Sequence, residues 1–260
     1  MQENETKQRK GKETKIIEKN NKEKVEKIEK TKTQFKHAKF IRISGIVLGI
    51  YYILAIGVSR YITRGPDSIY DNWWVCNAGM VLGVIGMLTL KLQMVGGACL
   101  LIFFPSIFWC IDVVSYLVAR KLPLGSASYM FKDDTPFLEI ASTTHHLWYL
   151  PFALFIISLE TRININSWLI SNGVLTFIVV GARIFTPKYT LLPDGRNFLL
   201  NVNMAYNFWD DCPIKFMHYF DDWHPVVYLT YMNFIGYFGF HLGAFIICHP
   251  ISRLISRSKK

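Results

Sequence analysis

Long apolar stretches separated by polar connections fill the chain after residue 40. Each stretch holds 18 to 26 residues, close to the roughly 20 that a helix needs to cross the hydrocarbon core of a bilayer. The predicted spanning segments are Ile41–Ile62, Trp73–Leu90, Met94–Ala119, Phe137–Leu159, Ile165–Phe185 and Val226–Cys248. The pattern predicts an all-α fold, a polytopic membrane helical bundle with about six transmembrane helices.

The charged residues gather at the two ends of the chain. Residues 1–39 contain thirteen Lys and Arg residues and seven Glu residues, so this segment accounts for +6 of the formal charge of +10. Its low apolar content predicts a basic, disordered cytoplasmic tail, and its charges match no nucleic-acid-binding motif. We therefore expect no nucleic-acid partner. Residues 251–260 form a second, short basic tail after a transmembrane domain at 40–250.

Basic residues at both ends also predict the orientation of the bundle. Because cytoplasmic loops and tails carry an excess of Lys and Arg, both termini are expected on the cytoplasmic side, which an even number of spans permits. The long connection 186–225 then lies on the opposite side. Its aspartates, prolines and aromatic residues favour a structured loop over a linker.

The fourth segment carries ionisable side chains at membrane depth. Glu139, His145 and His146 lie within an otherwise apolar stretch. Because such groups cost about 2.5–3.5 kcal/mol each on insertion scales, they usually face the bundle interior and mark a functional site. The side chain of His146 is expected to point about 100° away from that of His145 on a regular helix.

Cys76 is the second candidate, a few residues into the second segment. Under the predicted topology, the second and fourth segments enter the membrane from the same face, so Cys76 and His145 can meet in one leaflet. A thiol and an imidazole in contact form a nucleophile and its base. Each residue also has a simpler interpretation: Cys76 as a small packing residue, and His145 as an interhelical hydrogen-bonding group.

Metal chemistry is not favoured by the sequence. The histidines show none of the repeated His-x-x-His-His clusters of membrane desaturases, and His218 and His224 are separated by five residues in a loop. No glycine-rich phosphate loop occurs either. The sequence therefore predicts no metal site and no cofactor.

The second to fourth segments resemble the transmembrane protein 164 family of acyltransferases. The matching runs are Val75-Cys-Asn77, Lys91-Leu-Gln-Met94 with Gly97-Ala98 and Phe104-Pro105, and Leu138-Glu-Ile140 followed by His145 and Pro151. A weaker similarity covers 199–225. Three features depart from the family: the basic N-terminal tail, the longer loop 120–136, and Asn77, where the family has a His.

The resemblance implies a function and a set of site residues. It implies acyl transfer from a phospholipid donor to an ether lysophospholipid acceptor in the endoplasmic reticulum, with Cys76 and His145 as the catalytic pair. The residues expected to contact the substrate are Asn77, Glu139, His146, Asn203, Asn207 and His224.

Two other functions fit the same residues. A transporter or lipid-binding scaffold would use His145, Glu139 and Asp112, of which Asp112 lies in the third segment. These side chains would line a polar path or serve as structural hydrogen-bonding groups. A lipid hydrolase would use the same Cys76–His145 pair with water as the acceptor. A separation of more than about 4–6 Å between the Cys76 sulfur and the His145 ring would argue against catalysis.

Overall fold

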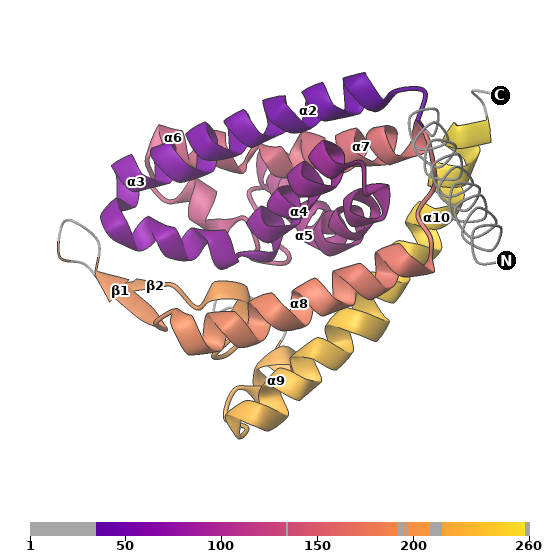
Figure 1. The fold of residues 1–260 in the computed structure, drawn as a ribbon. Coiled ribbons are helices and arrows are strands. Elements are labelled where there is room, and N and C mark those ends of the chain that lie inside the picture. The colour runs from indigo at the N-terminus through magenta and orange to yellow at the C-terminus, as the bar shows by residue number, and fades with distance from the viewer. Residues whose placement is uncertain (1–34, 134, 192–194, 196, 209–214, 258–260) are drawn as a thin grey trace, which may run out of the picture. The chain divides into compact units, whose positions relative to one another are not determined.

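The fold is an all-α helical bundle (Figure 1). The computed structural model describes residues 35–133, 135–191, 195, 197–208 and 215–257. The chain divides into two units, residues 1–38 and 39–260, and the second unit contains the bundle. Most of the predicted basic tail, residues 1–34, and the last three residues of the chain lie outside the described residues.

The first segment is one long helical stretch of changing geometry. It is made of α2 (Ala38–Tyr51), the π-helical η1 (Tyr52–Val58), α3 (Ser59–Arg64) and the 3-10 helix η2 (Gly65–Trp73). Its apolar side chains include Val47, Ile53 and Leu54, which are 58–61% exposed. A bundle helix that faces lipid needs apolar side chains on its exposed surface. The exposed apolar residues of this stretch meet that condition.

The central helix of the bundle is α5 (Leu92–Ala119), which packs against α4 (Val75–Thr89) and three later helices. Pro105 lies inside α5, and the helix continues through this residue. The chain turns between α4 and α5 at Leu90, whose φ of 57° is left-handed. The side chains from Val95 to Phe103 are almost all buried, so this part of α5 forms the core.

The predicted fourth segment is broken into two helices, α6 (Phe137–Thr143) and α7 (His145–Ser158). Three consecutive hydroxyl groups explain the break. Ser142, Thr143 and Thr144 each donate a side-chain hydrogen bond to the carbonyl three residues earlier, at 2.7–2.8 Å. Such bonds compete with the i→i−4 bonds of the helix. The first helix therefore ends before Thr144, and the second begins at His145.

The rest of the bundle follows α7 through a short connection. The remaining elements are α8 (Ile165–Phe185), β1 (Tyr189–Leu191), β2 (Asn197–Leu199), η4 (Val202–Met204), η5 (Lys215–Phe220), α9 (Pro225–Phe234), the π-helical η6 (Ile235–His241) and α10 (Leu242–Arg257). The antiparallel strands β1 and β2 pair Tyr189 with Leu199. The loop 186–225 therefore has regular structure in its described part, and α10 extends nine residues beyond the predicted end of the last span.

Asp112 anchors the loop between α5 and α6, which contains η3 (Ser128–Phe131). The Asp112 carboxylate is fully buried and accepts hydrogen bonds from Leu124 N at 2.8 Å, Ser126 Oγ at 2.8 Å and Ala127 N at 3.1 Å. Its oxygens are thus used to fold the loop back against α5. This structural role explains why an apolar helix contains a carboxylate. A transport path is not needed to account for it.

The chain is a multi-pass helical membrane protein. Five of the described helical stretches are long and apolar enough to cross a bilayer: Ala38–Trp73, Leu92–Ala119, Phe137–Ser158, Ile165–Phe185 and Pro225–Ser256. The predicted segment Trp73–Leu90 forms the apolar helix α4, but with only 15 residues. At 1.5 Å per residue α4 is about 22 Å long, shorter than a full span. The fold class predicted from the sequence is confirmed.

Candidate active site

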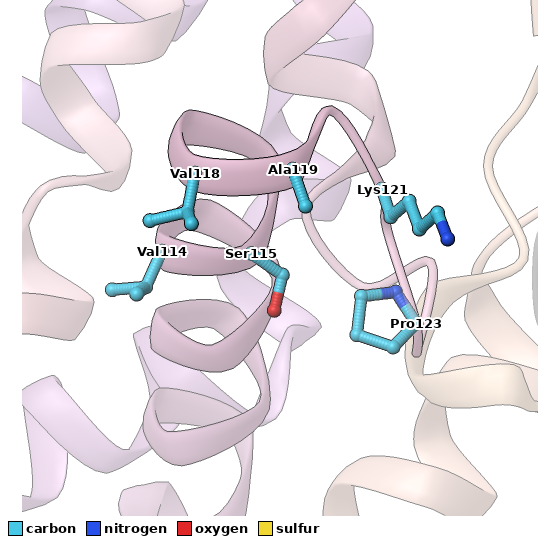
Figure 2. Close-up of a pocket in the computed structure, with 6 residues that line it drawn as sticks. All are labelled: Val114, Ser115, Val118, Ala119, Lys121 and Pro123. Atoms are coloured by element: carbon cyan, nitrogen blue, oxygen red, sulfur yellow. The ribbon is translucent and has the colours of Figure 1, made fainter.

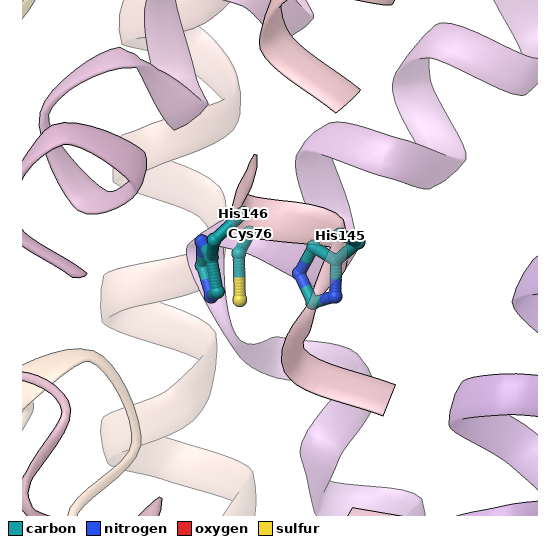
Figure 3. A group of neighbouring side chains, drawn as sticks. All are labelled: Cys76, His145 and His146. Atoms are coloured by element: carbon teal, nitrogen blue, oxygen red, sulfur yellow. The ribbon is translucent and has the colours of Figure 1, made fainter. Parts of the chain in front are cut away.

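Cys76, His145 and His146 lie together inside the bundle. One ligand atom from each residue, the Cys sulfur or a ring nitrogen, lies within 4.8 Å of the others. Figure 3 shows the Cys76 sulfur between the two imidazole rings. Cys76 is the second residue of α4, and the histidines are the first two residues of α7. The site is therefore formed where two helices begin.

The start of α4 is held in place by the loop 186–225. Val75 N donates to the side-chain oxygen of Asn203 at 2.7 Å, and the Asn203 amide group donates to the carbonyl of Trp73. The side chain of Asn203 thus satisfies a backbone N–H that has no partner within its own helix. Asn203 was expected to contact a lipid headgroup; in the structure it positions the residue next to Cys76.

His145 has a defined orientation. Its Nδ1 lies 2.7 Å from the carbonyl oxygen of Ser142, and a carbonyl can only accept a hydrogen bond. Nδ1 therefore carries the proton, and Nε2 is left as an acceptor with a free lone pair. The side chain is 3% exposed, and Nε2 is buried with no hydrogen-bond partner among the described residues. In Figure 3 a ring nitrogen of His145 points toward Cys76.

His146 does not point away from the site, as a regular helix predicted. The rings of His145 and His146 are 4.3 Å apart, and His146 stacks on Trp109 at 5.7 Å. Both histidines lie in the first turn of α7, and their rings are close enough for both to contact the same cluster. Nδ1 of His146 and the Nε1 of Trp109 are also buried without a hydrogen-bond partner among the described residues.

Asn77 lies beside the thiol. The Cys76 sulfur is 3.8 Å from the side-chain oxygen of Asn77, and the Asn77 amide donates to the carbonyl of Asp71 at 2.7 Å. This second bond fixes the orientation of the Asn77 amide, so its oxygen faces the thiol as an acceptor. The thiol can thus donate its hydrogen to Asn77 while the site is empty.

Glu139 belongs to a buried network of four charges. Its carboxylate pairs with Arg60 at 2.6 Å and with Arg64, and Arg64 also reaches Asp71 at 3.2 Å. Arg60, Asp71 and Glu139 are each less than 9% exposed. Two cations and two anions balance, which is the condition for burying such groups. Glu139, expected at the substrate, is therefore engaged with α3.

Arg60 and Tyr129 were missed by the sequence analysis. Arg60 acts electrostatically on both Cys76 and His145, and on the phenol of Tyr129. Burial raises the pKa of Tyr129 to about 12, with Arg60 opposing the shift and Cys76 adding to it. Burial thus favours the neutral form of the Tyr129 hydroxyl. The four-residue spacing of Arg60 and Arg64, one helical face, was a usable signal for the arginines; η3 offered none for Tyr129.

Asn207 and His224 form hydrogen bonds within their own segment. The Asn207 amide donates to Phe208 O at 2.8 Å, and its backbone oxygen accepts from Asn201 at 2.7 Å. His224 is exposed and caps α9 by accepting from Val226 N at 3.4 Å. The structure thus gives both residues a local role in the loop that precedes α9.

No family model matches the chain. Comparisons with curated proteins and with solved structures also gave no significant match. The similarity to the transmembrane protein 164 family therefore stays an expectation from the sequence.

The arrangement supports two kinds of chemistry. A thiol beside an oriented, unprotonated imidazole nitrogen can act as a nucleophile. One thiol and two imidazoles can also hold a metal ion. The metal alternatives considered from the sequence included His218, but this residue lies 2.9 Å from Asp221 in the loop, and the structure brings Cys76 to the histidines instead.

A pocket of about 370 Å³ opens at the end of α5 (Figure 2). It is lined by Val114, Ser115, Val118, Ala119, Lys121 and Pro123. These residues come from the last turns of α5 and the loop that Asp112 anchors. None of the candidate site residues lines this pocket, so the cysteine–histidine cluster is a separate feature.

Proposed function

We propose that the chain is a membrane lipid acyltransferase that works through an acyl thioester on Cys76. The observation that carries this proposal is the orientation of His145. Because Ser142 fixes the proton on Nδ1, the lone pair of Nε2 is free, and a ring nitrogen of His145 lies within 4.8 Å of the Cys76 sulfur. Catalytic hydrogen bonds are often longer than about 2.6–3.2 Å before substrate binds, so substrate binding would bring the base and the thiol together.

The reaction has two halves. His145 Nε2 takes the proton of the Cys76 thiol, and the sulfur attacks the ester carbonyl carbon of a phospholipid. Collapse of the tetrahedral intermediate breaks the bond to the glycerol oxygen, which leaves with the proton from His145. The lysophospholipid acceptor then loses its hydroxyl proton to His145 and attacks the thioester, releasing the new ester and the free thiol.

Buried donors around the thiol would stabilise the developing oxyanion. The N–H group of Trp109 is buried, lacks a partner among the described residues and belongs to a ring stacked on His146. Donors already in place in a site of low dielectric act without reorganisation. The endoplasmic reticulum is the proposed location, by the family resemblance.

The test is acyl loading of the purified protein. The full chain in detergent is incubated with an alkyne-tagged diacyl phospholipid, and the modified residue is mapped before and after hydroxylamine. We expect a hydroxylamine-sensitive acyl group on Cys76, lost in Cys76→Ala and kept in Cys110→Ala. Cys110 is the matched control because it is a partly buried free cysteine in α5, outside the cluster.

The second half of the test concerns the acceptor. Adding an ether lysophospholipid should discharge the thioester with formation of a diradyl lipid. Discharge to free fatty acid at the same rate with and without acceptor would instead identify a hydrolase. Absence of acyl label on Cys76 in folded, lipid-loaded protein would reject the thioester mechanism.

A further inference from the structure

The cysteine–histidine cluster contains two unsatisfied ring nitrogens, and the thioester mechanism uses only the one on His145. His145 Nε2 and His146 Nδ1 are both buried without a hydrogen-bond partner among the described residues. Other buried or half-buried imidazoles of the bundle are satisfied: His241 lies 2.8 Å from the Asn172 side chain, and His249 Nδ1 lies 2.6 Å from the Ile163 carbonyl. An unsatisfied buried polar atom costs free energy.

The two imidazole rings and the Cys76 sulfur are close enough to share one ligand. One ring nitrogen of each histidine and the sulfur all lie within 4.8 Å of one another. Ligand atoms around a tetrahedral Zn²⁺ are about 3.3–3.7 Å apart, given Zn–N of about 2.0–2.1 Å and Zn–S of about 2.3 Å. Closing the remaining gap of about 1 Å requires only small side-chain rotations. A divalent cation would satisfy both nitrogens at once.

The donor set selects the type of cation. One thiolate and two imidazoles are soft or borderline ligands, which suit Zn²⁺ and similar transition metals and not Mg²⁺ or Ca²⁺. The nearby carboxylates of Asp71 and Glu139 are already paired with Arg64 and Arg60. The hydrogen bond from His145 Nδ1 to the Ser142 carbonyl is also the type of contact that commonly orients a metal-binding histidine.

We propose that Cys76, His145 and His146 form a three-ligand site for Zn²⁺ or a similar divalent transition metal, and that the bound ion excludes the acyl group from Cys76. Binding releases the thiol proton to solvent and leaves a fourth coordination position open. Because the ion occupies both the nucleophile and the lone pair of the base, metal-bound protein cannot form the thioester. The exclusion of the acyl group rests on the proposed function; the binding of the ion does not.

The binding is tested with Co²⁺, whose spectrum reports its ligands. Purified full-length protein in detergent is freed of metal with a chelator and titrated with Co²⁺. We expect one ion per chain, a sulfur-to-cobalt charge-transfer band and the intense visible bands of a tetrahedral site, all displaced by Zn²⁺. Cys76→Ser should lose the charge-transfer band.

Substitutions of the proposed ligand residues test whether Co²⁺ binds at this site or elsewhere on the protein. Cys76→Ser and His146→Gln should each weaken Co²⁺ binding more than 100-fold, because loss of a second-shell contact alone costs about 10–100-fold. The matched controls Cys110→Ser and His249→Gln should bind as the unmodified protein does. Equal binding in Cys76→Ser or His146→Gln, or a spectrum without the charge-transfer band, would overturn the assignment. Size-exclusion profiles and helical circular dichroism establish that each variant is folded.

Acyl loading in the presence of the metal tests the second part. One equivalent of Zn²⁺ should abolish loading of Cys76 from the tagged phospholipid, and a chelator should restore it. Loading that persists with Zn²⁺ bound would overturn the exclusion. Co²⁺ bound through Cys76 in a protein that never forms a thioester when metal-free would refute the proposed function and leave the metal site standing. Thioester formation on Cys76 in a protein that binds no Co²⁺ would support the proposed function and refute the metal site.

Discussion

His145 Nδ1 donates a hydrogen bond to the Ser142 carbonyl across the break between α6 and α7, at a distance of 2.7 Å. Ser142 lies in the last turn of α6, and the hydroxyls of Ser142, Thr143 and Thr144 each donate to the carbonyl three residues earlier. A carbonyl at the end of α6 thus fixes the tautomer of His145, the candidate general base.

The first prediction separates the two ring nitrogens of His145. In His145→Asn the side-chain amide can still donate to Ser142 in place of Nδ1, but nothing replaces Nε2. We expect this variant to keep the thermal stability of the unmodified protein within a few degrees and to lose acyl loading of Cys76 by about 100-fold or more, the usual contribution of a general base. Loading measured by the tagged phospholipid checks it. Unchanged loading in His145→Asn would remove His145 from the reaction.

The buried network predicts a large cost for removing one charge. Asp71→Ala leaves a buried arginine with one partner fewer, so we expect a loss of about 3–5 kcal/mol in the free energy of unfolding. Asp222→Ala, at an exposed aspartate, should change it by less than about 0.5 kcal/mol. Denaturant unfolding in detergent, followed by circular dichroism, measures both. Equal stability of the two variants would contradict the charge balance inferred for Arg60, Arg64, Asp71 and Glu139.

Asn203 is expected to control the site from a distance. Its backbone has a φ of 54°, a left-handed conformation that glycine adopts without strain. Asn203→Gly therefore removes the bonds to Val75 and Trp73 while keeping the backbone, at a cost of about 0.5–1.5 kcal/mol for each hydrogen bond. Acyl loading of Cys76 should fall more than stability does. Asn203→Asp, which keeps the acceptor for Val75 N, should recover part of the loading; loading unchanged in Asn203→Gly would show that this contact does not position Cys76.

The orientation of the bundle can be measured directly. Lys91 lies in the turn between α4 and α5, at the end of the bundle where the first span begins, whereas Gly195 lies in the loop 186–225 at the other end. By the excess of basic residues near the termini, a cysteine at Lys91 should react with a membrane-impermeant maleimide only from the cytoplasmic side. A cysteine at Gly195 should react only from the opposite side. Labelling in oriented vesicles checks this in a variant with the native cysteines replaced, and the reverse pattern would contradict the predicted orientation.

The sequence by itself determined the class of the fold and the positions of the helices. Apolar stretches near 20 residues have few alternatives to a transmembrane helix, because every backbone polar group must be satisfied within the hydrocarbon layer. An ionisable side chain at membrane depth is costly, and this singled out His145. The catalytic role of Cys76 was predicted from the family resemblance. The sequence determined helix length less well. The helix α4 is shorter than the predicted apolar stretch because Trp73 and Trp74, the first residues of that stretch, lie outside the helix.

Only the tertiary structure decided which polar groups meet. The rings of His145 and His146 are 4.3 Å apart and both lie in the cluster with Cys76, although helical spacing by itself separates their directions by about 100°. Glu139 is engaged by Arg60 and Arg64, and Asn203 by the start of α4, through contacts between residues 75 to 128 positions apart in the chain. Local patterns carry information about backbone geometry within a helix. The partner of a buried charge or hydrogen-bonding group is set by packing between helices, where sequence distance gives no guide.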